Sequence, residues 1–257
     1  MNQGILPTVN ILGIPFSLYT TKETVSYWKL LIQSGGSEHI ITANPEAVMM
    51  ALTDERLYKI FQRAAQITPD GIGIVWASKY YGRSISERVT GADTTPLLLK
   101  EAEQEGWSVF ILGASPESNQ KALDNLKIQY PNLRLAGHHG YFGDQLPLIL
   151  EQIRTFRPHI LLVGLGMPKQ ELFIAEYQEQ LQVPLMIGIG GCIDIWAGTV
   201  KRAPRLFQNL RAEWFYRLVS QPSRWRRQLV LPQFAWKVLR DTRFGKRTRW
   251  PEDTSRS

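Results

Sequence analysis

The stretch Ile160-Leu161-Leu162-Val163-Gly164-Leu165-Gly166-Met167-Pro168 decides the fold class of this 257-residue chain. Its first four residues are apolar and β-prone, which is typical of a strand that is buried on both faces. The glycines that follow predict a tight turn, and the sequence from Pro168 to Leu181 predicts a helix. A buried strand, a glycine-rich loop and a helix in this order indicate one unit of a parallel sheet.

The same alternation continues in both directions along the chain. After an opening apolar stretch at 5–14, the predicted strands lie at 39–43, 107–112, 133–138, 160–163 and 183–187. The predicted helices lie at 20–34, 45 to about 58, 116–128, 143–155 and 168–181. Helices of 10–15 residues between short apolar strands are typical of right-handed βαβ units. The sequence therefore predicts an α/β, Rossmann-like fold: a mainly parallel sheet with flanking helices.

The sequence changes character near Gly198-Thr199-Val200, which predicts a core at 1–199 and an appendage at 200–257. The appendage holds 15 of the 30 Lys and Arg but 4 of the 23 Asp and Glu, giving it a formal charge of +11 against −4 for the core. It also carries four of the eight tryptophans. Pro204, Pro222 and Pro232 each predict the start of a short helix. A basic, Trp-rich end predicts a polyanionic partner, either nucleic acid or an anionic membrane.

Composition excludes several classes of protein. Hydrophobic residues make up 44% of the chain and charged residues 21%, which is ordinary for a globular protein. Cys192 is the single cysteine, so no internal disulfide can form. The sequence contains no apolar run of about 18 residues and no signal-peptide pattern at its start, so a cytoplasmic protein is expected.

Three of the predicted strands end in glycine-rich loops. Gly113 follows the strand at 107–112, Gly164 and Gly166 follow 160–163, and Gly190 lies after 183–187. Glycine lets a phosphate approach the backbone, and helix N-termini supply oriented N–H donors, so these loops predict a nucleotide site. The sequence contains neither the full dinucleotide fingerprint nor a P-loop motif, which disfavours NAD enzymes and P-loop NTPases.

An ordered series of motifs resembles the WecG/TagA/CpsF family of bacterial glycosyltransferases over about residues 8–240. The series comprises Thr42-Ala43-Asn44-Pro45-Glu46, Pro69-Asp70-Gly71-Ile72-Gly73, Glu87-Arg88-Val89-Thr90-Gly91-Ala92-Asp93, Gly166-Met167-Pro168-Lys169-Gln170-Glu171, Arg202-Ala203-Pro204, and Glu213-Trp214-Phe215-Tyr216-Arg217-Leu218 followed by Pro222-Ser223-Arg224. The resemblance implies an inverting transfer from a UDP-sugar to a lipid-diphosphate-linked sugar at the cytoplasmic membrane face. N-acetylmannosamine is the expected sugar and undecaprenyl-diphosphate-GlcNAc the expected acceptor.

The resemblance places Asp70, Thr42 and Asn44 among the catalytic residues. Asp70 matches the family's proposed general base, a role that requires a carboxylate within reach of the acceptor hydroxyl. The alternative for Asp70 is an N-cap of the helix that begins at Gly71. For Thr42 and Asn44, which would orient a sugar, the alternative is local backbone capping.

Further matching positions predict contacts with substrate. Gln170 matches a position near the donor, with a solvated first-turn residue as the alternative, and Arg88 and Asp93 belong to the same motif series. Lys169 and Glu171 could equally be surface residues. In the appendage, Arg217, Arg224 and Arg227 would neutralise a diphosphate, since the guanidinium fork binds phosphate oxygens bidentately; the alternative is a solvated basic face.

No metal or other cofactor is predicted. The chain contains no Asp-x-Asp motif, and the pair His138-His139 lacks further ligands at metal-binding spacing. The leaving-group charge would then be met by arginines and helix N-termini.

Two alternatives stay open on the sequence. One is the same family with another donor, namely UDP-glucose, UDP-glucuronate or the uronic acid of UDP-N-acetylmannosamine. The other is a non-catalytic nucleotide- or nucleic-acid-binding module with a basic tail. Tryptophans on helices with apolar faces favour a bilayer surface over nucleic acid. The oligomeric state is left open, and a homo-oligomer is compatible with the sequence.

Overall fold

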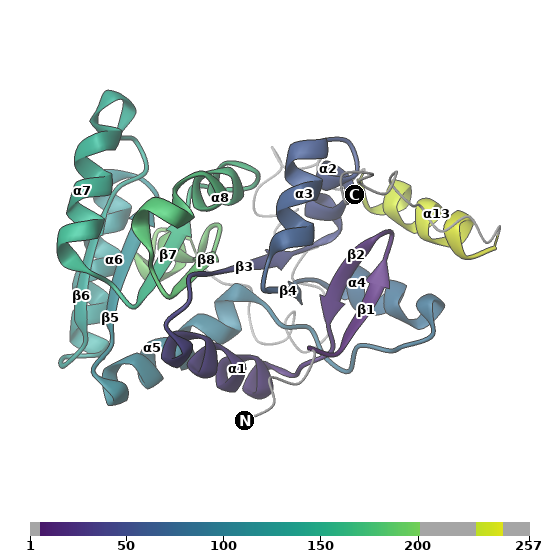
Figure 1. Cartoon of the computed structure of the whole chain (residues 1–257), viewed down its shortest axis with the longest axis horizontal. Coiled ribbons are helices and arrows are strands. Elements are labelled where there is room, and N and C mark those ends of the chain that lie inside the picture. The colour runs from purple at the N-terminus through teal and green to yellow at the C-terminus, as the bar shows by residue number, and fades with distance from the viewer. Residues whose placement is uncertain (1–5, 201–229, 244–257) are drawn as a thin grey trace, which may run out of the picture.

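A computed structural model of the chain describes residues 6–200 and 230–243. Its centre is a six-stranded, fully parallel sheet with the strand order β4-β3-β8-β7-β5-β6 (Figure 1). The predicted α/β class with a parallel sheet is therefore confirmed. The strands are β3 (Glu38–Ala43), β4 (Gln66–Pro69), β5 (Ser108–Gly113), β6 (Arg134–His138), β7 (Ile160–Gly164) and β8 (Leu185–Gly188).

Side chains of the inner strands alternate between two apolar layers, because both faces of the sheet are covered by helices. In β7, Ile160 and Leu162 face one layer, while Leu161 and Val163 face the other. The first layer is built with α1 (Thr21–Ser34), α5 (Gly91–Glu105), α6 (Pro116–Gln129) and α9 (Cys192–Trp196). The second layer is built with α7 (Leu146–Phe156) and α8 (Lys169–Leu181). Over β3 and β4, the apolar side chains pack against α2 (Pro45–Ala51) and α3 (Glu55–Arg63).

Three local differences from the predicted elements have identifiable causes. The opening apolar stretch forms an antiparallel hairpin, β1 (Thr8–Ile11) and β2 (Ile14–Ser17), because Leu12 and Gly13 both adopt positive φ. The helix predicted from 45 to 58 is two helices, since Asp54 accepts a hydrogen bond from the Leu57 N–H and starts α3. The helix predicted at 143–155 begins with the 3-10 turn η2 (Gly143–Gln145).

The turn after β4 leads into α4 (Ile72–Ser78) and the 3-10 turn η1 (Lys79–Tyr81). These elements lie beside the hairpin, at the end of the molecule opposite β6 and α7 (Figure 1). The helix α13 (Val230–Arg243) lies at the same end, with Pro232 in its first turn as predicted. None of the helices in the described ranges is both long and apolar enough to cross a bilayer.

Helix α13 packs onto the core, a contact that the division at residue 199 did not anticipate. Phe234 and Val238, one helical turn apart, are 1% and 0% exposed and join the apolar layer of α2, α3 and α4. The Tyr81 hydroxyl donates a hydrogen bond of 2.8 Å to the Asp241 carboxylate. Burial, reinforced by this carboxylate, raises the pKa of Tyr81. The division into 1–199 and 200–257 stays a prediction, while α13 itself is fastened to the α/β body.

Candidate active site

The predicted site residues of the core gather at the carboxyl edge of the sheet, where the strands feed into loops and helix N-termini. This edge contains a topological switch between β5 and β7: β5 leads outward to β6, whereas β7 leads inward to β8. Ligands of open α/β sheets bind at such switch points. The structure places the predicted residues in two neighbouring groups along this edge, one at β3 and β4 and one at β5, β7 and β8.

Asp70 lies directly after β4, and its own main chain fixes the turn. The Asp70 N–H donates hydrogen bonds to the carbonyls of Ala43 (2.9 Å) and Thr68 (3.0 Å). The N-cap position of α4 is Gly71, so Asp70 lies one residue outside the cap and the N-cap interpretation is wrong. Gly71 has φ +137°, a conformation that glycine adopts readily and that lets the chain turn sharply after Asp70. Asp70 is half-buried.

Thr42 and Asn44 flank the end of β3, and the two have different local roles. The Thr42 hydroxyl donates 2.9 Å to the Gly188 carbonyl on β8, so it joins two strand ends instead of capping a helix. Asn44 is exposed and its Oδ1 accepts a hydrogen bond of 2.9 Å from Ala47, which makes it the N-cap of α2. Local capping is thus wrong for Thr42 and confirmed for Asn44. Asn44 also lies against the turn after β4, since a Cβ added to Gly71 would come within 3.7 Å of its Cβ.

Arg88 and Asp93 approach the Asp70 turn from the start of α5. The Val89 N–H donates 3.0 Å to the Pro69 carbonyl, which holds this segment beside the end of β4. Arg88 Nη2 and Asp93 Oδ2 are 3.8 Å apart. The same carboxylate oxygen accepts a hydrogen bond of 2.8 Å from the hydroxyl of Thr90, the N-cap of α5. Asp93 therefore takes part in the helix cap, and Arg88 directly precedes Val89, the residue that is held beside the Asp70 turn.

At the switch point, Gly113 and Gly164 end paired strands and allow close backbone contact. The two are register partners, and a Cβ on Gly113 would lie 2.4 Å from the Gly164 carbonyl oxygen. A Cβ on Gly164 would meet both Ile193 and the Gly190 carbonyl. Gly166, in contrast, has open space around it, but its φ is +78°. Glycine is therefore favoured at this position by the backbone conformation and not by a lack of space. Gly113 and Gly164 therefore allow the strand ends of β5 and β7 and the loop at Gly190 to pack closely.

Gln170 is buried, 3% exposed, so the solvated first-turn alternative is wrong. Its Oε1 accepts a hydrogen bond of 3.0 Å from the Gly190 N–H, and its Nε2 donates 2.9 Å to Glu171 Oε1. The Gly190 N–H is therefore directed at Gln170. Lys169 is exposed, as the surface interpretation expects, whereas Glu171 is fully buried.

Sequence reasoning missed the pairing of Glu171 with His39. His39 Nε2 and Glu171 Oε2 are 2.6 Å apart, and their side chains are 4% and 0% exposed. A signal was present, because Glu171 precedes Ile174 by three residues and so lies on the apolar stripe of α8. A carboxylate on a core-facing stripe requires a partner in the core.

Arg217, Arg224 and Arg227 lie outside the described residues. In the part of the chain that the structure describes, no three His, Cys, Asp or Glu side chains gather as a metal site. The rings of His138 and His139 contact each other at the end of β6, with centroids 4.1 Å apart and planes tilted by 44°.

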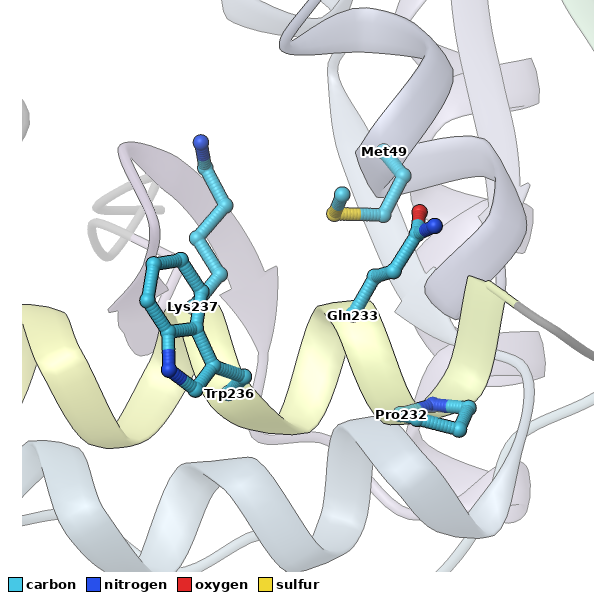
Figure 2. Close-up of a pocket in the computed structure, with 5 residues that line it drawn as sticks. All are labelled: Met49, Pro232, Gln233, Trp236 and Lys237. Atoms are coloured by element: carbon cyan, nitrogen blue, oxygen red, sulfur yellow. The ribbon is translucent and has the colours of Figure 1, made fainter.

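A pocket between α2 and α13 contains none of the residues predicted to be catalytic in its lining. Met49 projects from α2 toward the α13 side chains that complete it (Figure 2). The lining residues are Met49, Pro232, Gln233, Trp236 and Lys237.

Comparisons with known proteins show which family the chain belongs to. The family model described as the glycosyl transferase WecG/TagA/CpsF family matches residues 9–248. Similar proteins occur in Staphylococcus aureus strains MRSA252, MW2 and NCTC 8325 / PS 47, each named N-acetylglucosaminyldiphosphoundecaprenol N-acetyl-beta-D-mannosaminyltransferase. Each is 34% identical over 243 residues, covering 94% of this chain and 96% of the relative. The match includes both the sheet and the segment that carries α13, and the chain belongs to the WecG/TagA/CpsF family of glycosyltransferases.

Proposed function

We propose that this protein is an inverting glycosyltransferase that moves N-acetylmannosamine from UDP-N-acetylmannosamine to GlcNAc-diphosphoundecaprenol. The observation that carries the proposal is the end-to-end similarity to relatives named for that acceptor and that sugar, at 34% identity over 94% of this chain. The proposed site is the carboxyl edge of the sheet, and the product would serve the synthesis of a cell-surface polymer.

In the proposed reaction, the acceptor hydroxyl attacks the anomeric carbon of the donor sugar. The new C–O bond forms as the bond from that carbon to the UDP phosphate breaks, and one such displacement inverts the anomeric configuration. Asp70 takes the proton from the attacking hydroxyl, and a positioned base contributes about 10²–10⁴-fold to the rate. Two observations support Asp70: its side chain does not sit at the N-cap position of α4, and its turn is anchored to β3 beside Thr42 and Asn44.

The leaving UDP carries charge that the protein must stabilise. Arg88 lies near the Asp70 turn, and α8 begins immediately after the Gly164–Pro168 loop at the switch point. A helix N-terminus in this position favours a phosphate. We assign the remaining charge to Arg217, Arg224 and Arg227 of the appendage, because guanidinium groups bind diphosphate oxygens bidentately. This distribution of charge calls for no divalent metal.

The lipid-linked acceptor implies peripheral contact with an anionic membrane at its cytoplasmic face. Gln233, Trp236, Arg240 and Arg243 recur at helical spacing along one exposed stripe of α13, while Phe234 and Val238 face the core. Arg240 lies over the Trp236 ring, 5.1 Å from its centroid. An exposed tryptophan next to arginines suits the interface between headgroups and acyl chains.

A donor screen tests the proposal. The full-length protein is incubated with a short-chain GlcNAc-diphospholipid and one of four donors: UDP-N-acetylmannosamine, its uronic acid, UDP-glucose or UDP-glucuronate. We expect UDP release with UDP-N-acetylmannosamine to exceed that with the other donors, and NMR of the product to show an inverted anomeric centre. Preference for another donor would mean that the protein transfers that donor's sugar and not N-acetylmannosamine. A product with retained anomeric configuration would exclude the single displacement. No UDP release with any donor would overturn the transferase proposal.

A further inference from the structure

The buried pair His39–Glu171 connects β3 to the loop after β8 through a continuous line of hydrogen bonds. Glu171 Oε2 contacts His39 Nε2 at 2.6 Å, and Glu171 Oε1 accepts from Gln170 Nε2 at 2.9 Å. Gln170 Oε1 then accepts from the Gly190 N–H at 3.0 Å. The line runs from His39, near the start of β3, to the glycine-rich loop at the carboxyl edge of the sheet.

A carboxylate is the one side chain at position 171 that sets the orientation of the Gln170 amide without ambiguity. A carboxylate only accepts hydrogen bonds, so the NH₂ group of Gln170 must face it. The Gln170 carbonyl oxygen must then face the other way, toward the Gly190 N–H. If the amide were reversed, its NH₂ group would meet the Gly190 N–H, and two donors would face each other.

The surroundings leave this arrangement little freedom. Glu171 is 0% exposed and Gln170 is 3% exposed. Gly188 lies against both, since a Cβ at that position would be 2.4 Å from Gln170 Nε2 and from Glu171 Oε1. Burying an ionisable pair incurs a desolvation penalty that a well-packed apolar pair avoids. Stability alone is therefore a weak explanation for the presence of His39 and Glu171 in the core. Its position next to the proposed donor site suggests another role.

We propose that Glu171, held by His39, is a positioning residue for sugar transfer: it fixes the Gln170 amide, and through it the Ile189–Gly191 loop that receives the sugar nucleotide. The role of the loop rests on the proposed function. The chain of contacts itself does not, so the two can be tested separately.

The first test is hydrogen exchange of the Gly190 amide, measured by NMR in the absence of substrate. Glu171→Gln is nearly isosteric, but it gives position 171 a donor and thereby allows Gln170 to reverse. We expect the Gly190 amide to exchange at least about tenfold faster in Glu171→Gln, as for a lost hydrogen bond. The matched control is Glu176→Gln on the exposed side of the same helix, where Glu176 pairs with Arg56 at 3.1 Å; it should leave Gly190 exchange unchanged.

The second test is a double-mutant cycle on transfer between positions 170 and 171. Glu171→Gln alone should lower kcat by up to about 10²-fold, the cost of a small misplacement of reacting groups, while the melting temperature changes little. In a Gln170→Ala background, Glu171→Gln should have little further effect, because Glu171 acts through Gln170. His39→Gln, which keeps a donor toward Glu171, should retain more activity than His39→Leu.

The outcomes separate this proposal from the proposed function. Gly190 exchange in Glu171→Gln equal to that of the wild type would overturn the positioning role, whatever the activity. Additive effects in the double-mutant cycle would also overturn it, since Glu171 would then act independently of Gln170. If the wild-type protein transfers no sugar, the proposed function fails, while the exchange experiment still reports on the chain of contacts.

Discussion

The main-chain N–H of Asp70 donates a hydrogen bond of 2.9 Å to the carbonyl of Ala43, so the turn after β4 is fastened to the end of β3. This bond sets the Asp70 turn beside Thr42 and Asn44. It involves the main chain of Asp70 and not its carboxylate, so a side-chain substitution at position 70 preserves the anchoring of the turn.

The first prediction follows from that separation. Asp70→Asn should lower turnover by at least about 10²-fold, because the amide cannot take the acceptor proton, while the affinity for UDP changes little. Steady-state kinetics and calorimetric UDP binding measure the two effects. Asp54→Ala is a control for stability, because Asp54 caps α3 and its loss should cost about 1 kcal/mol of the free energy of unfolding. Near-normal turnover in Asp70→Asn would remove this residue from the mechanism.

The second prediction concerns metal ions. Transfer should persist in excess EDTA, because arginines and helix N-termini are assigned the positive charge that a cation would supply. The test is the rate of UDP release, measured in EDTA and again after Mg²⁺ or Mn²⁺ is added in excess. Activity that disappears in EDTA and returns with either ion would reveal a metal requirement.

The third prediction concerns the packing of α13. Phe234→Ala should lower the free energy of unfolding by about 3–5 kcal/mol, since it empties a fully buried aromatic site in the layer shared with α2 and α4. Urea denaturation measures the change. Trp236→Ala, two residues away and 62% exposed, should stay within about 0.5 kcal/mol of the wild type. Equal stability of the two variants would mean that α13 is not held by the core in solution.

The fourth prediction concerns the exposed stripe of α13. Each Lys or Arg near an anionic leaflet contributes about 1 kcal/mol, so Arg240→Glu combined with Arg243→Glu should strongly reduce co-sedimentation with anionic vesicles. Neutral vesicles should bind both proteins weakly, and Lys121→Glu combined with Lys127→Glu on the exposed face of α6 serves as a charge-matched control. Unchanged vesicle binding would exclude this stripe from the membrane contact. Stronger retention of the wild type on DNA-cellulose than on vesicles would favour the nucleic-acid alternative.

The fifth prediction is a pH dependence of stability. Burial, followed by the nearby Arg134, lowers the pKa of His159, whose Nδ1 accepts a hydrogen bond from the Ser108 N–H. The unfolded chain therefore binds a proton at this residue more readily than the folded chain. Stability contributed by neutral His159 is present above the ordinary pKa of about 6.5 and is lost as the pH falls toward the lowered value. The drop in melting temperature from pH 7.5 to 5.5 should be smaller in His159→Asn; an identical drop would contradict this.

The sequence predicted five of the six sheet strands, because strands covered on both faces read as short apolar runs. The strand β4 was not predicted, since Gln66 and Thr68 interrupt its apolar pattern. Ile160–Val163 was found within one residue of β7. The order of the strands in the sheet could not be predicted from apolar runs, because it depends on which strands, far apart in the sequence, pair with each other. The break between α2 and α3 was not predicted, because the N-cap Asp54 lies within the range predicted as one helix.

At the candidate site, the sequence motifs indicated which residues to consider, but not which residues they form hydrogen bonds with. The alternatives weighed for Thr42 and Gln170 considered local contacts, whereas the hydrogen bonds that define them reach Gly188 and Gly190 on another strand and its loop. His39 and Glu171 were missed for the same reason: their separation of 132 residues is bridged only by the packing of α8 on β3. Contacts of this kind follow from topology rather than from sequence neighbours.

The insertion of β8 between β3 and β7 has a consequence for how the protein is made. A ribosome delivers β3 to β7 first, and these strands can form two partial sheets, β3 with β4 and β5 with β6 and β7. Until Leu185–Gly188 emerges, the inner edges of β3 and β7 both lack their shared neighbour. Unpaired strand edges are templates for aggregation. Nascent chains that end before residue 185 should therefore depend on chaperones, and chains that include β8 should no longer need them.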